Sequence, residues 1–140
     1  MIVLDTNVLS EPLKPKPNPA VLNWLDAQAP GTLYLTTINM AELQAGIEVM
    51  PAGRRRDALE LAVSKQVFAL FAGRVLSFDA KAAHTFSTAY ASALAHGNRI
   101  GFADCAIAAI AIGNGFAVAT RNVRDFKGTG ITLIDPWEVS

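Results

Sequence analysis

Cysteine is nearly missing from this sequence, and an excess of either charge is missing altogether. The single cysteine, Cys105, excludes an internal disulfide framework and a metal site of the CxxC type, and it suits a reducing compartment. Lys and Arg together number 12, and Asp and Glu together number 12, so the chain lacks the global positive field that would hold nucleic acid. Any contact with nucleic acid must therefore be local.

A long hydrophobic run is also missing. The longest apolar stretch without charge, residues 105–120, is interrupted by Gly113-Asn114-Gly115 and is shorter than the roughly 20 residues of a membrane helix. The N-terminus lacks the basic region, the apolar segment and the small-residue cleavage site of a secretory signal. We therefore expect a cytoplasmic protein without a membrane segment.

Charged residues are sparse, at 17% of the chain against a typical share of about 25%. Such a composition leaves apolar side chains on the surface of a monomer, where a partner can cover them. We expect an oligomer, with a homodimer as its simplest form. Candidate contacts are Val21, Leu22 and Trp24 and the helix that follows Arg56.

Hydrophobic residues make up 51% of the 140 residues, which is enough for the core of one domain, residues 1–140, and excludes intrinsic disorder. Short apolar runs alternate with helical patterns, and this order predicts an α/β fold with a central, mainly parallel β-sheet flanked by helices. The predicted strands are residues 2–4, 33–36, 75–78, 116–119 and 131–134. Five helices are predicted. The first begins at Pro19 behind the cap Asn18, and the second covers 38–50 behind the cap Thr37. The others run from Arg54 to Leu70, from the cap Asp79 to His96, and over 102–112.

Three carboxylates occupy positions that suit a metal site. Asp5 follows the first strand, at the edge where parallel sheets bind ligands. Glu42 shares a helical face with Ile38, Asn39, Ala45, Gly46 and Val49, which we expect to point inward. Asp104 is the only charged residue of the apolar helix 102–112. A buried carboxylate protonates, pairs with a cation or binds a metal. Neither helix contains Lys or Arg, although Arg99 and Arg121 could reach the carboxylates from loops. A hard cation such as Mg²⁺ or Mn²⁺ would satisfy all three.

Each carboxylate also has a simpler role open to it. Asp5 could be a turn or cap residue, and Glu42 could be a partly exposed helix residue. Asp125 is flanked by Arg121 and Arg124, which offer ordinary ion pairing in a solvated loop. The conjunction of the first three carboxylates is what favours function.

The other polar residues favour structural roles. We expect His84 and His96 to be ordinary helix residues and Cys105 to be a small buried hydrophobe. The basic run Arg54 to Arg56 is typical of the solvated start of a helix, and contact with a phosphate backbone is the alternative role.

Four motifs in order identify a family. The segments "IVLDTNVLSE", "TTINMAELQAGIE", "IGFADCAIAAIA" and "VATRNVRDF", followed by "DPW", resemble the PIN-domain ribonucleases, specifically the VapC and FitB toxins of bacterial toxin–antitoxin pairs. The resemblance covers essentially the whole chain and implies a single PIN-like domain and a Mg²⁺- or Mn²⁺-dependent endoribonuclease. The positions that match the family's acidic residues are Asp5, Glu42 and Asp104. The fourth acidic position falls where this chain has Asn122 and then Asp125, and either of them can fill it.

The resemblance also implies a mechanism and partners. The metal would lower the pKa of a bound water and neutralise charge on the scissile phosphate. A cognate antitoxin would cover the site, often with a basic side chain, and two toxins would form a dimer. The residues that could orient the metal ligands through hydrogen bonds are Thr6, Asn7, Thr120 and Asn122, with turn capping as their alternative role. Arg99 and Arg121 are candidates for contacts with substrate phosphates.

Two other classes stay open at this point. A haloacid dehalogenase-like phosphatase also begins with an aspartate after its first strand, but its pattern requires a second acid two residues on, where this chain has Asn7. A degenerate PIN-like module that only binds a partner or RNA is the alternative without catalysis, and Asn122 at the fourth acidic position keeps it open.

Overall fold

A five-stranded sheet forms the centre of the molecule, and every pair of neighbouring strands is parallel. The computed structural model describes residues 1–138. The strand order is β3-β2-β1-β4-β5, so β1 lies in the middle of the sheet. The strands are β1 (Ile2–Leu4), β2 (Leu33–Thr36), β3 (Val75–Leu76), β4 (Ala117–Ala119) and β5 (Leu133–Ile134). All five predicted strands are confirmed, although β3, β4 and β5 are shorter than predicted.

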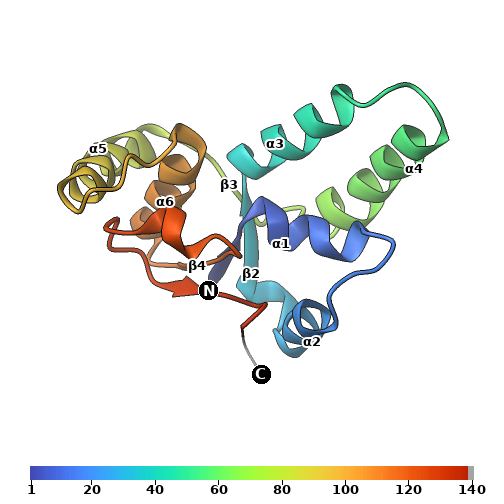
Figure 1. Cartoon of the computed structure of the whole chain (residues 1–140), viewed down its shortest axis with the longest axis horizontal. Helices are drawn as coiled ribbons and strands as arrows, with labels where there is room; N and C mark the ends of the chain where they lie inside the picture. Colours follow the sequence, from blue (N-terminus) through green and yellow to red (C-terminus); the bar gives the residue numbers. More distant parts are fainter. Residues whose placement is uncertain (139–140) are drawn as a thin grey trace.

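Helices cover both faces of the sheet, as expected for a parallel sheet (Figure 1). The α-helices are α1 (Thr6–Ser10), α2 (Pro19–Ala27), α3 (Thr37–Glu48), α4 (Arg54–Ala62), α5 (Ala80–Ala95) and α6 (Phe102–Asn114). Shorter turns are η1 (Glu11–Leu13), η2 (Pro30–Thr32), η3 (Val63–Phe68) and η4 (Val123–Phe126). In Figure 1, α5 and α6 lie on one side of the sheet and α1 to α4 on the other.

The two faces of the sheet build separate core layers. Leu4 of β1 packs with side chains of α1 to α3, and Val3 packs with α6 and η4. Neighbouring residues of a strand point to opposite faces, so a single central strand supplies both layers. Asp5 directly follows the last residue of β1. Because β1 is the central strand and is buried from both sides, the Asp5 side chain lies at the centre of the sheet's carboxyl edge.

The local helix signals mostly hold, with three corrections. Asn18 and Asp79 cap α2 and α5 as predicted, but Thr36, not Thr37, caps α3. The short helix α1, which Asp5 caps, follows β1 directly and was not predicted. The helix expected from Arg54 to Leu70 is regular only as α4 and continues as the wider π turn η3.

Two of the three expected partner contacts on α2 are wrong. Val21 is fully buried and Trp24 is 9% exposed, because α2 packs this apolar stripe into the core of its own chain. Leu22 is half-buried, and its contact stays a prediction. Within residues 1–138, no helix is both long enough and apolar enough to span a bilayer.

The end of α5 anchors the loop that follows η4. Ser92 donates a hydrogen bond to the Gly128 carbonyl (2.6 Å), and Asn98 donates to the carbonyls of Asp125 (3.1 Å) and Lys127 (2.9 Å). A Cβ at Gly128, where φ is +80°, would lie 2.7 Å from the Cβ of His96. Only glycine therefore fits this close approach.

Two alanine substitutions separate the close approach from the backbone conformation. Gly130 has nearly the same φ, +86°, but an added Cβ would meet nothing within 4 Å. We expect Gly130→Ala to lower the free energy of unfolding by about 1–2 kcal/mol through its left-handed conformation alone. Gly128→Ala should lose clearly more, measured by urea denaturation. Equal losses would contradict tight packing of this loop on α5.

Candidate active site

Asp5 is a buried carboxylate that is fixed from two sides. It is 6% exposed, its Oδ1 accepts a hydrogen bond from the Thr6 backbone N–H (2.8 Å), and its Oδ2 accepts from the Thr120 hydroxyl (2.8 Å). Burial raises the pKa of Asp5 above its ordinary value, although these two hydrogen bonds act in the opposite direction. Thr120 follows β4, the neighbour of β1, so two adjacent strand ends hold one carboxylate.

Glu42 reaches the same edge through Thr6. Its Oε1 accepts a hydrogen bond from the Thr6 hydroxyl (2.6 Å), and this hydroxyl accepts one from the Asn39 side-chain amide (3.0 Å). Asn39 is buried and forms a capping box with Thr36 at the start of α3. The Glu42 carboxylate is therefore held by neutral hydrogen-bonding groups that are themselves held in the core.

The prediction that the Glu42 face of α3 points inward is wrong for most of that face. Asn39 is buried as predicted, but Glu42, Ala45, Gly46 and Val49 are exposed. The buried stripe continues from Asn39 to Leu43 and Ile47. Small apolar residues lie around most of this helix, so periodicity alone selected the wrong stripe.

Asp104 lies in the first turn of α6 and is half-buried. Burial is the main cause that raises the pKa of Asp104 to about 6, and the charges of Asp5, Asp125 and Glu42 add to it in that order. The expected full burial of this position is wrong, because the buried part of α6 begins at the next residue, Cys105. All the charged neighbours named here carry the same sign as Asp104.

The segment after β4 supplies the two candidates for a fourth ligand. The Asn122 backbone N–H donates to the Thr120 hydroxyl (3.0 Å), and the residue lines the cleft beside Asp5. Asp125 is exposed on η4, and its charge raises the pKa of both Asp5 and Asp104. In the described part of the chain, Asp125 forms no ion pair with Arg121 or Arg124.

These carboxylates surround a polar cleft of about 410 Å³. Its lining residues are Asp5, Thr6, Asn7, Ser10, Lys14, Glu42, Asp104, Arg121, Asn122 and Trp137. The Arg121 guanidinium lies over the Trp137 ring, 5.2 Å from its centroid. Arg99 and Asp125 are exposed and lie outside this lining. Thr120 is also outside the lining, but its hydroxyl donates a hydrogen bond to Asp5.

Sequence reasoning missed three cleft residues, Ser10, Lys14 and Trp137. Trp137 belongs to the "DPW" motif, which was a signal without an assigned role. Lys14 stands three residues after Glu11, a spacing that is typical of ordinary surface pairs.

The residues of the cleft fit a divalent cation. Across residues 1–138, no Lys, Arg or His forms an ion pair with Asp5, Glu42, Asp104 or Asp125, so their repulsion has no protein counter-charge at contact distance. No three Asp, Glu, His or Cys side chains in this same part come close enough to share one ion directly. Mg²⁺ keeps several waters and commonly takes only one or two carboxylates directly, so the arrangement suits an ion bound partly through water.

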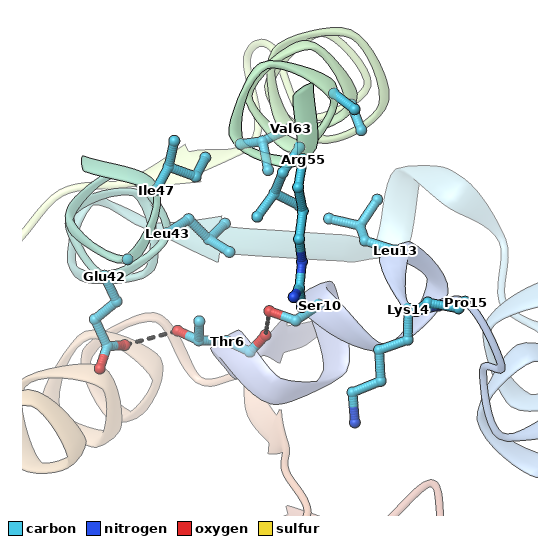
Figure 2. A pocket seen from close by; sticks show the side chains of 14 residues that line it. Thr6, Ser10, Leu13, Lys14, Pro15, Glu42, Leu43, Ile47, Arg55 and Val63 are labelled. Atoms are coloured by element: carbon cyan, nitrogen blue, oxygen red, sulfur yellow. Dashed lines mark hydrogen bonds between the residues drawn. The ribbon is translucent and has the colours of Figure 1, made fainter. Parts of the chain in front are cut away.

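An apolar groove of about 810 Å³ adjoins the cleft, between α1, η1, α3 and α4. It shares Thr6, Ser10, Lys14 and Glu42 with the cleft. Figure 2 shows its apolar walls, with Leu43 and Ile47 on one side, and Arg55 reaching down from α4 toward Ser10. The other lining residues are Leu13, Pro15, Gly46, Ala58, Leu59, Ala62 and Val63.

Comparison with known proteins gives a family match over most of the chain. The model of the PIN domain family matches residues 2–131. The chain is 50% identical to plasmid stability protein StbB from Pseudomonas syringae pv. tomato and 48% identical to VapC ribonuclease Y4jK from Sinorhizobium fredii, each over 99% of both chains. It is 39% identical to toxin FitB from Neisseria gonorrhoeae, over 98% of this chain and 99% of that one.

Solved structures give the same result. The crystal structure of FitAcB from Neisseria gonorrhoeae superposes with a TM-score of 0.94 at 38% identity, covering 99% of this chain and 100% of that one. The structure of FitAB bound to an IR36 DNA fragment gives a TM-score of 0.95 at 37% identity, covering 100% and 98%. By its matched motifs, its all-parallel sheet and these full-length relatives, the chain belongs to the PIN domain family, in the group that contains the VapC ribonuclease and toxin FitB.

Proposed function

We propose that this chain is the toxin of a toxin–antitoxin pair and that it hydrolyses RNA as a metal-dependent endoribonuclease. One observation carries the proposal: Asp5, Glu42 and Asp104 line one cleft, and no Lys, Arg or His of residues 1–138 forms an ion pair with them. Such a cluster at the carboxyl edge of a parallel sheet is where a cation and a phosphate would both bind. The relative from Sinorhizobium fredii, named a VapC ribonuclease, supports RNA as the substrate.

The cleft has carboxylates that would hold the metal ion and hydroxyl groups that orient these carboxylates. Bound Mg²⁺ or Mn²⁺ would supply a water of lowered pKa and would offset the negative charge that grows on the phosphate. Asp5, Asp104 and Glu42 would hold the ion, and the hydroxyls of Thr120 and Thr6 fix the carboxylate oxygens of Asp5 and Glu42 in advance. Because these hydrogen bonds already exist, little reorganisation is needed when substrate arrives.

Further residues of the cleft would position the RNA. Arg121 is steadied by Trp137 and by its backbone N–H, which donates to the Asn7 side-chain oxygen (3.4 Å). A guanidinium can bind phosphate oxygens in a bidentate manner, so Arg121 is the proposed contact at the cleft. Arg99, outside the lining, would meet only a more distant phosphate.

The apolar groove is the proposed site of an antitoxin segment. Its apolar walls and its opening into the acidic cleft suit a chain that packs along α3 and α4 and carries a basic side chain to the carboxylates. The structure of FitAB, in which a FitB relative is combined with a second component, supports a partner of this kind. We expect such a partner to inhibit RNA cleavage, which assays with and without it would measure.

A homodimer is the proposed assembly, through an apolar surface on α5 and α6. Tyr90, Leu94 and Phe102 are 41%, 49% and 63% exposed, and Phe86 stacks with Tyr90 and packs against Phe102. Exposed aromatic residues in one patch are typical of protein interfaces. A strictly monomeric chain in light scattering at micromolar concentration would contradict the dimer.

The proposed location is the cytoplasm. Burial raises the pKa of Cys105 to about 11, so this thiol stays protonated at neutral pH.

A PIN-like module that binds RNA or a partner without cleaving is the second candidate function. The amide of Asn122 at the cleft, where the family has an acidic residue, favours it. Membership of the PIN family decides against the phosphatase alternative.

Substitution of Asp104 tests catalysis directly. We expect Asp104→Asn to lower RNA cleavage in Mn²⁺ by at least about a hundredfold, because it removes ligand charge at nearly constant volume. Asp26→Asn, at an exposed position of α2, removes the same charge elsewhere and should leave cleavage intact. Cleavage of a generic RNA by nuclease-free protein measures both. Equal activity of Asp104→Asn and the parent would overturn the proposed function, and an inactive parent would favour the binding module.

The same variant should stabilise the metal-free protein at neutral pH. The pKa of Asp104 is about 6 in the folded chain against an ordinary value of 3.8, so the folded state binds a proton more tightly than the unfolded state. Folding stability from this group therefore falls as pH rises from about 4 to 6. In EDTA, the Tm of Asp104→Asn should exceed that of the parent at pH 7, and the two should converge below pH 4. A lower Tm at pH 7 would make Asp104 a structural residue.

Two further substitutions decide which residue fills the fourth position. If Asp125 acts on the ion directly or through water, Asp125→Asn should raise the metal concentration for half-maximal cleavage about tenfold. Asn122→Asp should leave cleavage intact or lower that concentration, because a charged oxygen replaces a neutral one. Metal titrations of cleavage measure both effects, and an unchanged titration for Asp125→Asn would remove this residue from the site.

A further inference from the structure

We propose that Lys14 binds a phosphate of the RNA strand at the mouth of the acidic cleft, and that the buried Glu11 positions its ammonium group there. The inference rests on the proposed function and adds a cation that neither the motifs nor the family resemblance assigned.

Glu11 is a buried acid with one counter-charge. It is 3% exposed, and the Lys14 ammonium lies 3.2 Å from its Oε1. Its Oε2 is buried and has no hydrogen-bond partner in the described part of the chain. A buried carboxylate is costly without compensation, so this carboxylate strongly favours keeping the ammonium in place.

The backbone around Lys14 is stiff. Pro12 lies in the first turn of η1, Pro15 follows Lys14 directly, and the Lys14 N–H donates to the Glu11 carbonyl (3.2 Å). Proline fixes φ, so this segment has few conformations to lose when a ligand binds. An ordinary surface lysine lacks both this backbone and the buried anchor.

Lys14 stands where the cleft meets the groove. It lines both, and its side chain is 52% exposed, so the ammonium remains accessible to a ligand (Figure 2). Among the described residues that line the cleft, Lys14 and Arg121 are the cations, and Asp5, Glu42 and Asp104 are the acids.

The pairing of Lys14 leaves the cleft carboxylates available. Its ion pair is with Glu11, so the acids that would hold a metal are not neutralised by it. An ammonium group has three donors, and one bond to Glu11 leaves two for phosphate oxygens. In a chain with no net positive charge, such a local cation is the kind of contact that RNA requires.

The test compares two lysines of the same segment. Lys16 is exposed and lines neither cavity, so Lys16→Met removes the same charge as Lys14→Met without touching the cleft. We expect Lys14→Met to raise KM for RNA about five- to tenfold with kcat within twofold of the parent, and Lys16→Met to change neither. In the uncleaving Asp104→Asn background, Lys14→Met should also reduce the slope of log affinity against log salt by about 0.7, the contribution of one single-stranded phosphate contact.

Glu11 is tested as a positioning residue by a double-mutant cycle. Lys14→Met alone leaves Glu11 buried without a counter-charge, so the double variant Glu11→Gln with Lys14→Met guards against loss of the fold. Glu11→Gln should raise KM less than Lys14→Met does, and in the double variant it should add nothing further. A structural role alone would shift the Tm without this pattern in KM.

The possible outcomes separate the two proposals. If the parent cleaves RNA and Lys14→Met matches Lys16→Met in both KM and salt slope, the assignment of Lys14 is overturned and the proposed function stands. If the KM effects of Glu11→Gln and Lys14→Met multiply in the double variant, Glu11 does not act through Lys14. If the parent neither binds nor cleaves RNA in Mn²⁺, the proposed function fails and the assignment fails with it.

Discussion

Repulsion among like charges at one edge of the sheet is the constraint on which the rest of this structure depends. Asp5, Glu42, Asp104 and Asp125 come from four separate segments, and the charges of the other three each raise the pKa of Asp104. Water would normally separate such charges. Neutral hydrogen-bonding groups hold two of them instead, with the hydroxyls of Thr6 and Thr120 each donating to one carboxylate. The core must therefore be rigid enough to hold an arrangement that is unfavourable until a cation compensates it.

The fold supplies this rigidity through the central position of β1. With β2 on one side and β4 on the other, and helices packed on both faces, the end of β1 has little freedom. The capping box of α3 then couples the end of β2 to Thr6, and through it to Glu42. Short strands are sufficient here, because they position the residue that follows each of them.

The sequence was a good guide to what local patterns determine. Apolar runs located all five strands, and Asn18 and Asp79 marked two helix starts. The first motif also located Asp5 at the carboxyl edge, since the residue after a buried parallel strand must lie there. The sequence could not show which stripe of α3 is buried, because apolar side chains lie around most of that helix. Packing against α1 and η3 determines the buried stripe.

The sequence also could not predict which single polar residues are buried. Nothing in the sequence distinguishes the Glu11–Lys14 pair, three residues apart, from a solvated surface pair, although Glu11 is 3% exposed. Trp137 likewise meets Arg121 only after the chain has returned to the cleft from β5. Such contacts join segments that are far apart in sequence, and no local pattern encodes them.

The hydrogen bond from Thr120 to Asp5 joins residues 115 positions apart, and β1 finds one of its two neighbours only in β4. A chain emerging from the ribosome therefore carries its first strand incompletely paired through most of its synthesis. The cleft is assembled only when residues 120–137 have been made, because Thr120 supports Asp5, and Arg121, Asn122 and Trp137 line the cleft. A product that stops before Thr120 lacks the geometry of the acidic cleft even though it contains Asp5, Glu42 and Asp104. Synthesis of this segment is thus a structural condition for the site to exist.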